Sequence, residues 1–231
     1  MSETSDAPVE APAPSAPLDH LRAFVERNSR VSVPPLIPEI RLHLASEVVP
    51  LWHLTEEELD KSGLPPPFWA FAWAGGQALS RFILDHPDCV AGRQVLDFGA
   101  GSGICAIAAK LAGAASVQAS DIDRFSVAAM ELNAQENEVA LDVTSVDLID
   151  TDHGWDTILV GDMCYEQPLA GRIEAWLRHL NARGADVLIG DPGRTYLPKQ
   201  GLEKLISYSV MTSRELEDSD VRNTSVWRVL A

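Results

Sequence analysis

The stretch VLDFGAGSGICAIAAK, residues 95–110, decides the fold. An apolar run ends at Phe98, glycine residues follow it, and an Ala-rich segment continues to Lys110. This order predicts a buried strand, a tight glycine-rich turn and a helix. Such a turn brings backbone N–H groups at a helix N-terminus close to a bound nucleotide. The stretch therefore predicts an α/β protein with a nucleotide-type ligand.

The segments after this turn alternate between apolar runs and amphipathic stretches. We expect strands within residues 93–99, 116–123, 141–148, 155–163 and 185–193, in the second half of 202–217, and at 224–231. We expect helices at 104–114, 124–138, 169–182 and in the first half of 202–217. Strands that alternate with helices predict a doubly wound, mostly parallel sheet. The last two strands have no helix between them, which predicts an antiparallel hairpin at one edge.

The sequence before the turn indicates three parts. Residues 1–17 are acidic and rich in Ala and Pro, which predicts a disordered tail, and residues 18–67 form an N-terminal extension packed on a main domain at 68–231. Within these parts we expect a helix at 18–28, a strand at 40–45, a capped helical turn at 55–63 and a helix from about Gly76 to Asp85.

Composition excludes several classes of protein. A chain of 231 residues, 46% of them apolar, is long enough for one domain with a full core. No apolar run approaches the ~20 residues that span a bilayer. Three widely spaced cysteines and six histidines without ligand spacing predict neither a disulfide framework nor a metal site. The acidic N-terminus resembles neither a secretory signal nor a transit peptide, so we expect a cytoplasmic protein.

The charge of the chain bears on its partners. The net charge is −16, with 34 acidic against 18 basic residues. A field of this sign repels phosphate backbones and attracts cations. Two interpretations remain open, solubility alone or a basic partner. Either way, we expect no nucleic acid and no membrane partner.

The glycine turn favours one cofactor over another. Dinucleotide-binding turns follow the pattern G-x-G-x-x-G. Here Gly99 and Gly101 fit the pattern, but Ile104 stands in the third glycine's place, and Asp97 precedes the first glycine by two residues. A carboxylate repels a pyrophosphate and attracts an ammonium. S-adenosylmethionine has an ammonium and no phosphate, so we expect it, with S-adenosylhomocysteine as product, rather than NAD.

The next strand ends in a second acidic residue. Asp121 lies 22 residues beyond Gly99, where a carboxylate can accept hydrogen bonds from both ribose hydroxyls. An acidic residue at this place is also common as a plain helix cap. Asp123 is the better candidate for that cap, so we assign Asp121 to the ribose.

A third acidic residue is a candidate adenine contact. Asp147 follows the third strand and would accept a hydrogen bond from the adenine amine, while the backbone N–H of Leu148 faces the ring. Asp142 and Asp150 stand nearby as competitors. We assign Asp147 to the adenine amine, with Asp142 and Asp150 as the alternatives.

Two motifs resemble those of a known class. DFGAGSG (97–103) with SDID (120–123) resembles the seven-strand, Rossmann-like methyltransferases that use S-adenosylmethionine. Residues 68–87, 161–166 and 188–194 resemble the family 16 lysine methyltransferases, and among them the enzymes that modify the β-subunit of electron transfer flavoprotein. The likeness runs from about residue 21 to the C-terminus and includes PEIRLHL (38–44). It implies a Rossmann-like seven-strand methyltransferase fold with an N-terminal extension of helix and strand.

The resemblance also implies a partner and site residues. The implied partner is a basic protein substrate, the flavoprotein β-subunit, whose lysines accept methyl groups; we expect a monomer of the bacterial, cytoplasmic type. The family's acid-x-x-aromatic pattern maps onto Asp162 and Tyr165, and its cofactor-contacting tryptophan onto Trp73. Enzymes that methylate nucleic-acid amines resemble one another in an Asn/Asp-Pro-Pro-aromatic motif here. This chain lacks those prolines, which favours a protein substrate.

The chemistry of Asp162 can also be argued directly. Free lysine has a pKa of ~10.4, so it arrives protonated at neutral pH. A carboxylate would recruit and orient that ammonium, although by itself it raises the lysine pKa. Desolvation and a neighbouring sulfonium act in the opposite direction, and Tyr165 would offer a ring face to the methylated amine. A capping role for Asp162 and core packing for Tyr165 are the plain alternatives.

Several questions stay open at this point. The aromatic residues Phe68, Trp69 and Phe71 fit a core, in contrast to Trp73. GDPGR (190–194) is either part of a substrate mouth or a Pro-Gly turn with a surface arginine. Alternative functions are methylation of another protein lysine, such as one on a ribosomal protein, methylation of a small amine, or a catalytically silent cofactor-binding module.

Overall fold

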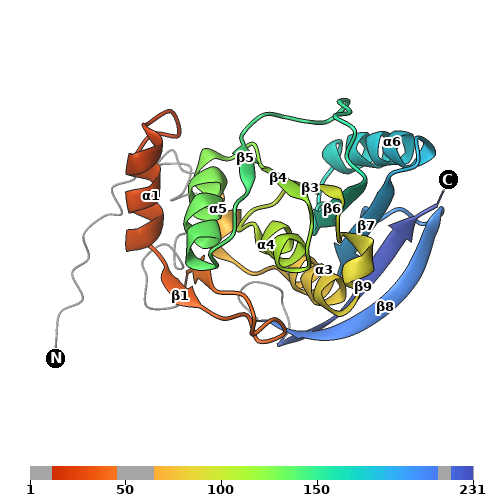
Figure 1. The fold of residues 1–231 in the computed structure, drawn as a ribbon, viewed down its shortest axis with the longest axis horizontal. Helices are drawn as coiled ribbons and strands as arrows, with labels where there is room; N and C mark the ends of the chain where they lie inside the picture. The colour runs from red at the N-terminus through yellow and green to blue at the C-terminus, as the bar shows by residue number, and fades with distance from the viewer. Residues whose placement is uncertain (1–11, 46–64, 213–219, 231) are drawn as a thin grey trace.

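A seven-stranded sheet forms the centre of the protein (Figure 1). The structure is a computed structural model that describes residues 12–45, 65–212 and 220–230. The strand order is β5-β4-β3-β6-β7-β9-β8; the strands from β5 to β7 are parallel, and β9 is antiparallel to both neighbours. The strands are β3 Gln94–Phe98, β4 Ser116–Ser120, β5 Asp142–Thr144, β6 Thr157–Gly161, β7 Asp186–Asp191, β8 Leu202–Met211 and β9 Val221–Val229. The predicted α/β fold and the antiparallel edge hairpin are confirmed.

Helices cover both faces of this sheet. They are α3 Ala74–Asp85, α4 Ile104–Leu111, α5 Arg124–Glu136 and α6 Leu169–Ala182. Apolar residues of α3, α4 and α5 pack in one cluster with Val95 of β3, while α6 packs with Leu96 and Phe98 on the other face. Successive strand residues point to opposite faces, so a sheet covered on both sides requires continuous apolar strands. This is why residues 95–98 are all buried and, apart from Asp97, all apolar.

The described part of the N-terminal extension lies against α5 (Figure 1). Helix α1 Leu18–Arg27 packs Phe24 edge-on against Phe125, with ring centroids 5.2 Å apart. β1 Arg30–Ser32 pairs with β2 Leu42–Leu44, and the side chain of Asn133 on α5 accepts from the His43 backbone N–H at 2.7 Å. The predicted helix at 18–28 and strand at 40–45 are present; β1 was not predicted. The short 3-10 helices are η2 Phe68–Ala70 and η3 Pro87–Cys89.

Two sequence predictions are wrong in their details. The helix expected in the first half of 202–217 is absent, because β8 runs from Leu202 to Met211 along β9. Its residues Ile206, Tyr208 and Val210 alternate at the period of a strand. The tail predicted to be disordered as far as residue 17 makes contacts earlier, because Arg124 Nη1 donates to the carbonyls of Pro14, at 2.7 Å, and Ala16, at 2.9 Å.

Other predictions fall outside the described residues. The predicted tail falls outside them at residues 1–11. The predicted helical turn at 55–63, with the rest of the extension between 46 and 64, also falls outside them, as does the end of the 202–217 segment. The division at residues 17 and 67 stays a prediction. Across the described ranges, none of the helices has the length and apolar character to cross a membrane.

Candidate active site

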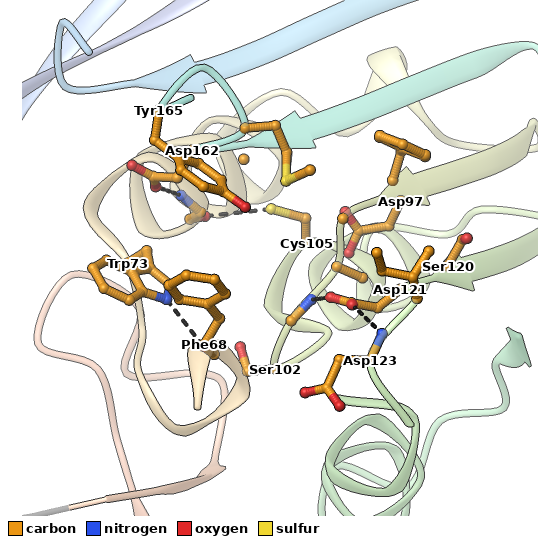
Figure 2. Close-up of a pocket in the computed structure, with 18 of the residues that line it drawn as sticks. Phe68, Trp73, Asp97, Ser102, Cys105, Ser120, Asp121, Asp123, Asp162 and Tyr165 are labelled. Carbon is orange, nitrogen blue, oxygen red and sulfur yellow. Dashed lines mark hydrogen bonds between the residues drawn. The ribbon is translucent and has the colours of Figure 1, made fainter. Parts of the chain in front are cut away.

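A cavity of about 920 Å³ opens at the carboxyl ends of β3, β4 and β6 (Figure 2). Parallel α/β sheets place their ligands at this edge, where the strand order reverses direction. The cavity is large enough for a nucleoside-sized ligand. Eight of the nine predicted site residues line it: Trp73, Asp97, Gly99, Gly101, Asp121, Asp147, Asp162 and Tyr165. Figure 2 shows Asp97, Asp121 and Asp123 on one side, with Asp162, Tyr165 and Trp73 on the other.

The glycine turn between β3 and α4 shapes the floor of this cavity. Gly99 and Gly101 have φ angles of 65° and 52°, in the left-handed region that glycine adopts without strain. A Cβ at Gly99 would overlap the side chain of Met163. The turn therefore brings bare backbone up to the cavity, as a close-lying ligand requires.

Asp97 is a buried carboxylate that lines the cavity. Its Oδ2 accepts a hydrogen bond from the Ala106 backbone N–H at 2.8 Å, and only 2% of the residue is exposed. Burial raises the pKa of Asp97 to about 7, and the neighbouring charge of Asp121 adds to the rise. Within the described residues no ion pair to Asp97 is recorded. A buried acid without a cation fits a ligand that brings an ammonium, as the sequence predicts.

Asp121 directly follows β4, and its carboxylate can accept further hydrogen bonds beyond those it makes to the protein. Its Oδ2 accepts from the Gly101 backbone N–H at 2.9 Å and its Oδ1 from the Asp123 backbone N–H at 3.0 Å. Each carboxylate oxygen has two acceptor positions, so both oxygens still have capacity for a ribose hydroxyl. Burial raises the pKa of Asp121. Asp123 caps α5 by accepting from the Phe125 backbone N–H at 2.9 Å, which confirms its predicted role.

The structure separates the three candidate adenine contacts. Asp147 lines the cavity and accepts from the Ile149 backbone N–H at 3.0 Å. Asp142 instead accepts from the Gln118 side chain, and Asp150 lies 3.8 Å from Arg172; neither lines the cavity.

Leu148 is the predicted residue that the cavity does not include. Its side chain is buried in the apolar cluster under α6, and Ile149 lines the cavity in its place. The positive φ of Asp150, 67°, marks a turn directly after these residues. The predicted contact of the Leu148 backbone N–H with the adenine ring concerns the main chain rather than the Leu148 side chain, and it stays a prediction.

An aromatic wall closes one side of the cavity. The ring of Phe68 lies 5.9 Å from Trp73 and 5.7 Å from Tyr165, and Phe71 lies 5.6 Å from Trp73. The indole N–H of Trp73 donates to the Phe68 carbonyl at 2.9 Å, which fixes the ring. Phe68 and Tyr165 are 42% and 38% exposed, so they stand at the mouth. Core packing holds for Trp69 but not for Phe68, a cavity residue that sequence reasoning missed.

Asp162 follows β6 and is held by four donors. Its Oδ2 accepts from the backbone N–H groups of Gly75 and Gly76 at the start of α3, and its Oδ1 from Arg194 Nε at 2.9 Å and Nη2 at 2.6 Å. A carboxylate has about four acceptor positions, so all of them are in use. The residue has a left-handed φ of 58°, a conformation that costs roughly 1–3 kcal/mol and persists only where the surrounding structure imposes it. A lysine ammonium would have to displace one of these donors to bind Asp162 directly.

Asp191 and Arg194 have different roles in the loop after β7. Asp191 Oδ1 accepts from the backbone N–H groups of Gly193, at 2.6 Å, and Arg194, at 2.7 Å, which builds the Pro-Gly turn. The Arg194 side chain turns back to Asp162, lies over the Trp73 ring at 5.7 Å and lines the cavity. Asp191 therefore builds the predicted Pro-Gly turn, whereas Arg194 lines the cavity; a part of GDPGR in a substrate mouth stays a prediction.

Helix α3 reaches Asp162 because two glycines let it approach β7. A Cβ at Gly75 would overlap the carbonyl oxygen of Gly190, and a Cβ at Gly190 would overlap the carbonyl oxygen of Gly75. Backbone contact of this kind leaves no space for any side chain. The Ala-Gly-Gly of residues 74–76 was the available signal in the sequence, and it was read only as a helix start.

The groups that line the cavity fit S-adenosylmethionine. Asp97 matches its ammonium, Asp121 its ribose, and the glycine turn its close approach to the backbone. When bound, the cofactor supplies a methyl group activated by a sulfonium. The chain's own residues surround the space next to it with aromatic rings and the Asp162–Arg194 pair. Among the described residues, no group of three His, Cys, Asp or Glu side chains is placed to hold a metal ion.

Comparison with known proteins gives the class. The family model of ribosomal protein L11 methyltransferase (PrmA) matches residues 78–160. The solved structure of a ribosomal protein L11 methylase from Lactobacillus delbrueckii subsp. bulgaricus is 24% identical with a TM-score of 0.48, covering 66% of this chain and 77% of that one. The sheet order, the glycine turn and the acid-lined cavity, together with the family-model match to residues 78–160, define a Rossmann-like, S-adenosylmethionine-dependent methyltransferase.

Curated relatives are similar over nearly the whole chain. Electron transfer flavoprotein beta subunit lysine methyltransferases from Xenopus laevis and Danio rerio are 40% and 38% identical, covering 89% and 91% of this chain and 85% and 83% of theirs. The enzyme of that name from Homo sapiens is 38% identical over 90% of this chain and 81% of its own. The chain belongs to the electron transfer flavoprotein β-subunit lysine methyltransferase family.

Proposed function

We propose that this enzyme transfers methyl groups from S-adenosylmethionine to lysine side chains of the β-subunit of electron transfer flavoprotein. The observation that carries the proposal is the extent of the similarity. Relatives named for this activity match 89–91% of the chain. The PrmA model matches residues 78–160 alone, beginning after Trp73 and ending before Asp162. The wider match therefore favours the flavoprotein, because it is not confined to the cofactor half of the cavity.

The cofactor roles that we propose follow the geometry. Asp97 holds the ammonium of the cofactor, Asp121 its ribose, and Asp147 its adenine amine, with Gly99 and Gly101 beneath. The raised pKa of Asp97, about 7, supports this assignment. Burial makes the ionised form of this carboxyl group unfavourable, and a bound cation would stabilise that form. Asp121 and Asp147 line the same cavity within one edge of the sheet.

The acceptor lysine enters along the aromatic wall in this proposal. Phe68 and Tyr165 are exposed at the mouth, and Trp73 lies deeper, where its ring already faces one cation. Aromatic rings attract ammonium groups by roughly 0.5–2 kcal/mol, whether or not these are methylated. The net charge of −16 suits a basic target surface, and three free, buried cysteines suit the reducing cytoplasm that we propose as its location.

A ribosomal protein is the second candidate substrate. Ribosomal protein L11 methyltransferase from Pseudomonas putida (strain W619) is 42% identical over 95 residues, 40% of this chain. This match supports a shared cofactor site more than a shared acceptor. A small amine and a silent cofactor-binding module are the remaining alternatives.

A single experiment separates these functions. The purified enzyme is incubated with tritiated S-adenosylmethionine and, in parallel, with electron transfer flavoprotein, ribosomal protein L11 and buffer alone. We expect label in the flavoprotein β-subunit, and mass spectrometry of its peptides should place each added 14 Da on lysine. Label in L11 alone, or in neither protein while the cofactor still binds, would replace the proposal by one of its alternatives.

A further inference from the structure

The Asp162–Arg194 pair changes what faces the acceptor amine. The sequence predicts a bare carboxylate that would bind the lysine ammonium. In the structure that carboxylate is neutralised by Arg194 and by two backbone N–H groups of α3. The side chain of Arg194 remains 20% exposed and lines the cavity beside Trp73. An entering amine therefore meets the guanidinium.

We propose that Arg194 is a positioning residue that keeps the acceptor lysine neutral; this inference rests on the proposed lysine methylation. A like charge close to an ammonium disfavours its protonated form and lowers its pKa. A guanidinium stays protonated at every working pH, so it cannot act as the base. Asp162 acts through Arg194, because its carboxylate fixes the guanidinium at the cavity.

The proton and electron pair are accounted for in this scheme. The lysine ammonium gives its proton to water as it enters beside Arg194. The nitrogen lone pair then forms a bond to the methyl carbon while the carbon–sulfur bond breaks, and that electron pair goes to sulfur. Without Arg194, the exposed carboxylate of Asp162 would bind the ammonium form and oppose the first of these steps.

Other titratable groups surround Arg194 and set the useful pH range. Those next to it are Asp162, Asp191, Cys164 and Tyr165, and those across the cavity are Asp97 and Asp121. Burial raises the pKa of Cys164 to about 12 and that of Tyr165 above its ordinary value, so both stay neutral through most of the alkaline range. Asp97, with a pKa of about 7, is mostly ionised above pH 7.5. Measurements between pH 7.5 and 10 therefore report chiefly on the lysine.

The first test is the pH profile of methyl transfer to the flavoprotein. We compare the wild type with Arg194→Gln, Arg194→Lys and, as a charge-matched control on the exposed Arg41–Glu136 pair, Arg41→Gln. In Arg194→Gln the alkaline rise should shift up by at least one pH unit, with a loss of roughly tenfold or more at pH 7.5 that shrinks by pH 10. KM should stay equal or fall, because Asp162 attracts the ammonium. Arg194→Lys should restore the wild-type profile near pH 8.

The second test measures the lysine without turnover. Calorimetry in two buffers of different ionisation enthalpy counts the protons released when the flavoprotein binds the enzyme with S-adenosylhomocysteine. This product lacks the sulfonium, so the release reports the protein's own charges. A lysine pKa lowered by ~2 units would release about half a proton at pH 8.5, and Arg194→Gln should release clearly less. Arg194→Met, which keeps the aliphatic stem against Trp73, replaces Arg194→Gln if that variant unfolds.

The outcomes separate this inference from the proposed function. If the wild type does not methylate the flavoprotein, the proposed function fails. If it does, and the neutral variants lose the same factor at every pH and release the same protons, Arg194 is merely structural and the inference is overturned.

Discussion

Cofactor binding should depend on pH through Asp97. Burial raises the pKa of this carboxyl from 3.8 to about 7, and within the described residues it has no recorded ion pair. Between pH 5.5 and 7.5 the ionised fraction of such a group rises roughly 25-fold. An α-amino group has a pKa of ~7.7–8.0 and is mostly protonated over this range. The dissociation constant of S-adenosylhomocysteine, which carries the same amino group, should fall by a similar factor, or ~2 kcal/mol.

The assay is calorimetry with this product in two buffers. At pH 6 the wild type should release about one proton on binding, because the ammonium selects the ionised carboxyl. Asp97→Asn keeps the size of the side chain and removes the titration. Its affinity should be weaker at pH 7.5 by roughly 1.5–3 kcal/mol, the value of a charge-assisted hydrogen bond. Burial also raises the pKa of Asp121 and Asp123, so the difference between wild type and variant is the quantity to read.

The same shift fixes the sign of a stability effect. A folded-state pKa above the unfolded one means that the folded protein keeps a proton that the unfolded chain loses. Asp97 therefore costs stability progressively as the pH rises from about 4 to 7, by roughly 4 kcal/mol in all. Without cofactor, Asp97→Asn should become more stable than the wild type as the pH rises through this window. A stability difference that is flat with pH, together with equal pH dependence of cofactor binding in both proteins, would refute this account of Asp97.

Three further perturbations test the rest of the site. Asp162→Asn places an amide N–H donor against backbone and guanidinium donors. It should therefore lower the free energy of unfolding in urea by ~3–5 kcal/mol and slow methyl transfer at least 100-fold. A fully stable variant would contradict the buried pair. Gly190→Ala should lower the free energy of unfolding by ~1–3 kcal/mol or more, because the new methyl group overlaps the backbone of α3. The control Gly171→Ala within α6 should be neutral or stabilising by up to ~1 kcal/mol. Equal melting temperatures for the two variants would disprove the close contact. Deleting residues 1–17 should lower stability by roughly 1 kcal/mol through lost hydrogen bonds to Arg124, while deleting 1–11 should change it little; equal loss in both would place the contact elsewhere.

The fold was predictable where local pattern and global architecture agree. The run from Val95 to Phe98 is apolar enough to need cover on both faces, and the glycines after it permit one tight turn. The sequence does not predict strand β8 over its full length because Leu202–Met211 mixes polar and apolar residues, five of them half-buried and four exposed. Its conformation depends on pairing with β9, a contact that its own sequence does not report.

The cofactor half of the site was predictable for a similar reason. Asp97, Gly99 and Asp121 stand at fixed offsets from strand ends, so their sequence position sets their place in space. The acceptor half depends on contacts between distant segments. The distance from Asp162 to Arg194 is 2.6 Å although 32 residues separate them, and its α3 partners lie 86 and 87 residues away. No spacing rule reports that a carboxylate is already occupied.

The contact between α3 and β7 makes this site hard to vary piece by piece. The space that a Cβ would need at Gly75 is occupied by the backbone oxygen of Gly190, and the reverse holds at Gly190. Neither position therefore tolerates a side chain, and replacing both glycines together would not remove the overlap. A mutant library of the acceptor pocket should keep both glycines and vary the exposed aromatic residues at the mouth, Phe68 and Tyr165. Among uncharacterised sequences, a glycine in the first turn of the helix that precedes the glycine-rich turn, an Asp directly after the fourth parallel strand, and Gly-Asp-x-x-Arg beginning at the end of the fifth parallel strand would together serve as a signature. Chains that carry it should share the occupied carboxylate, whatever amine they modify.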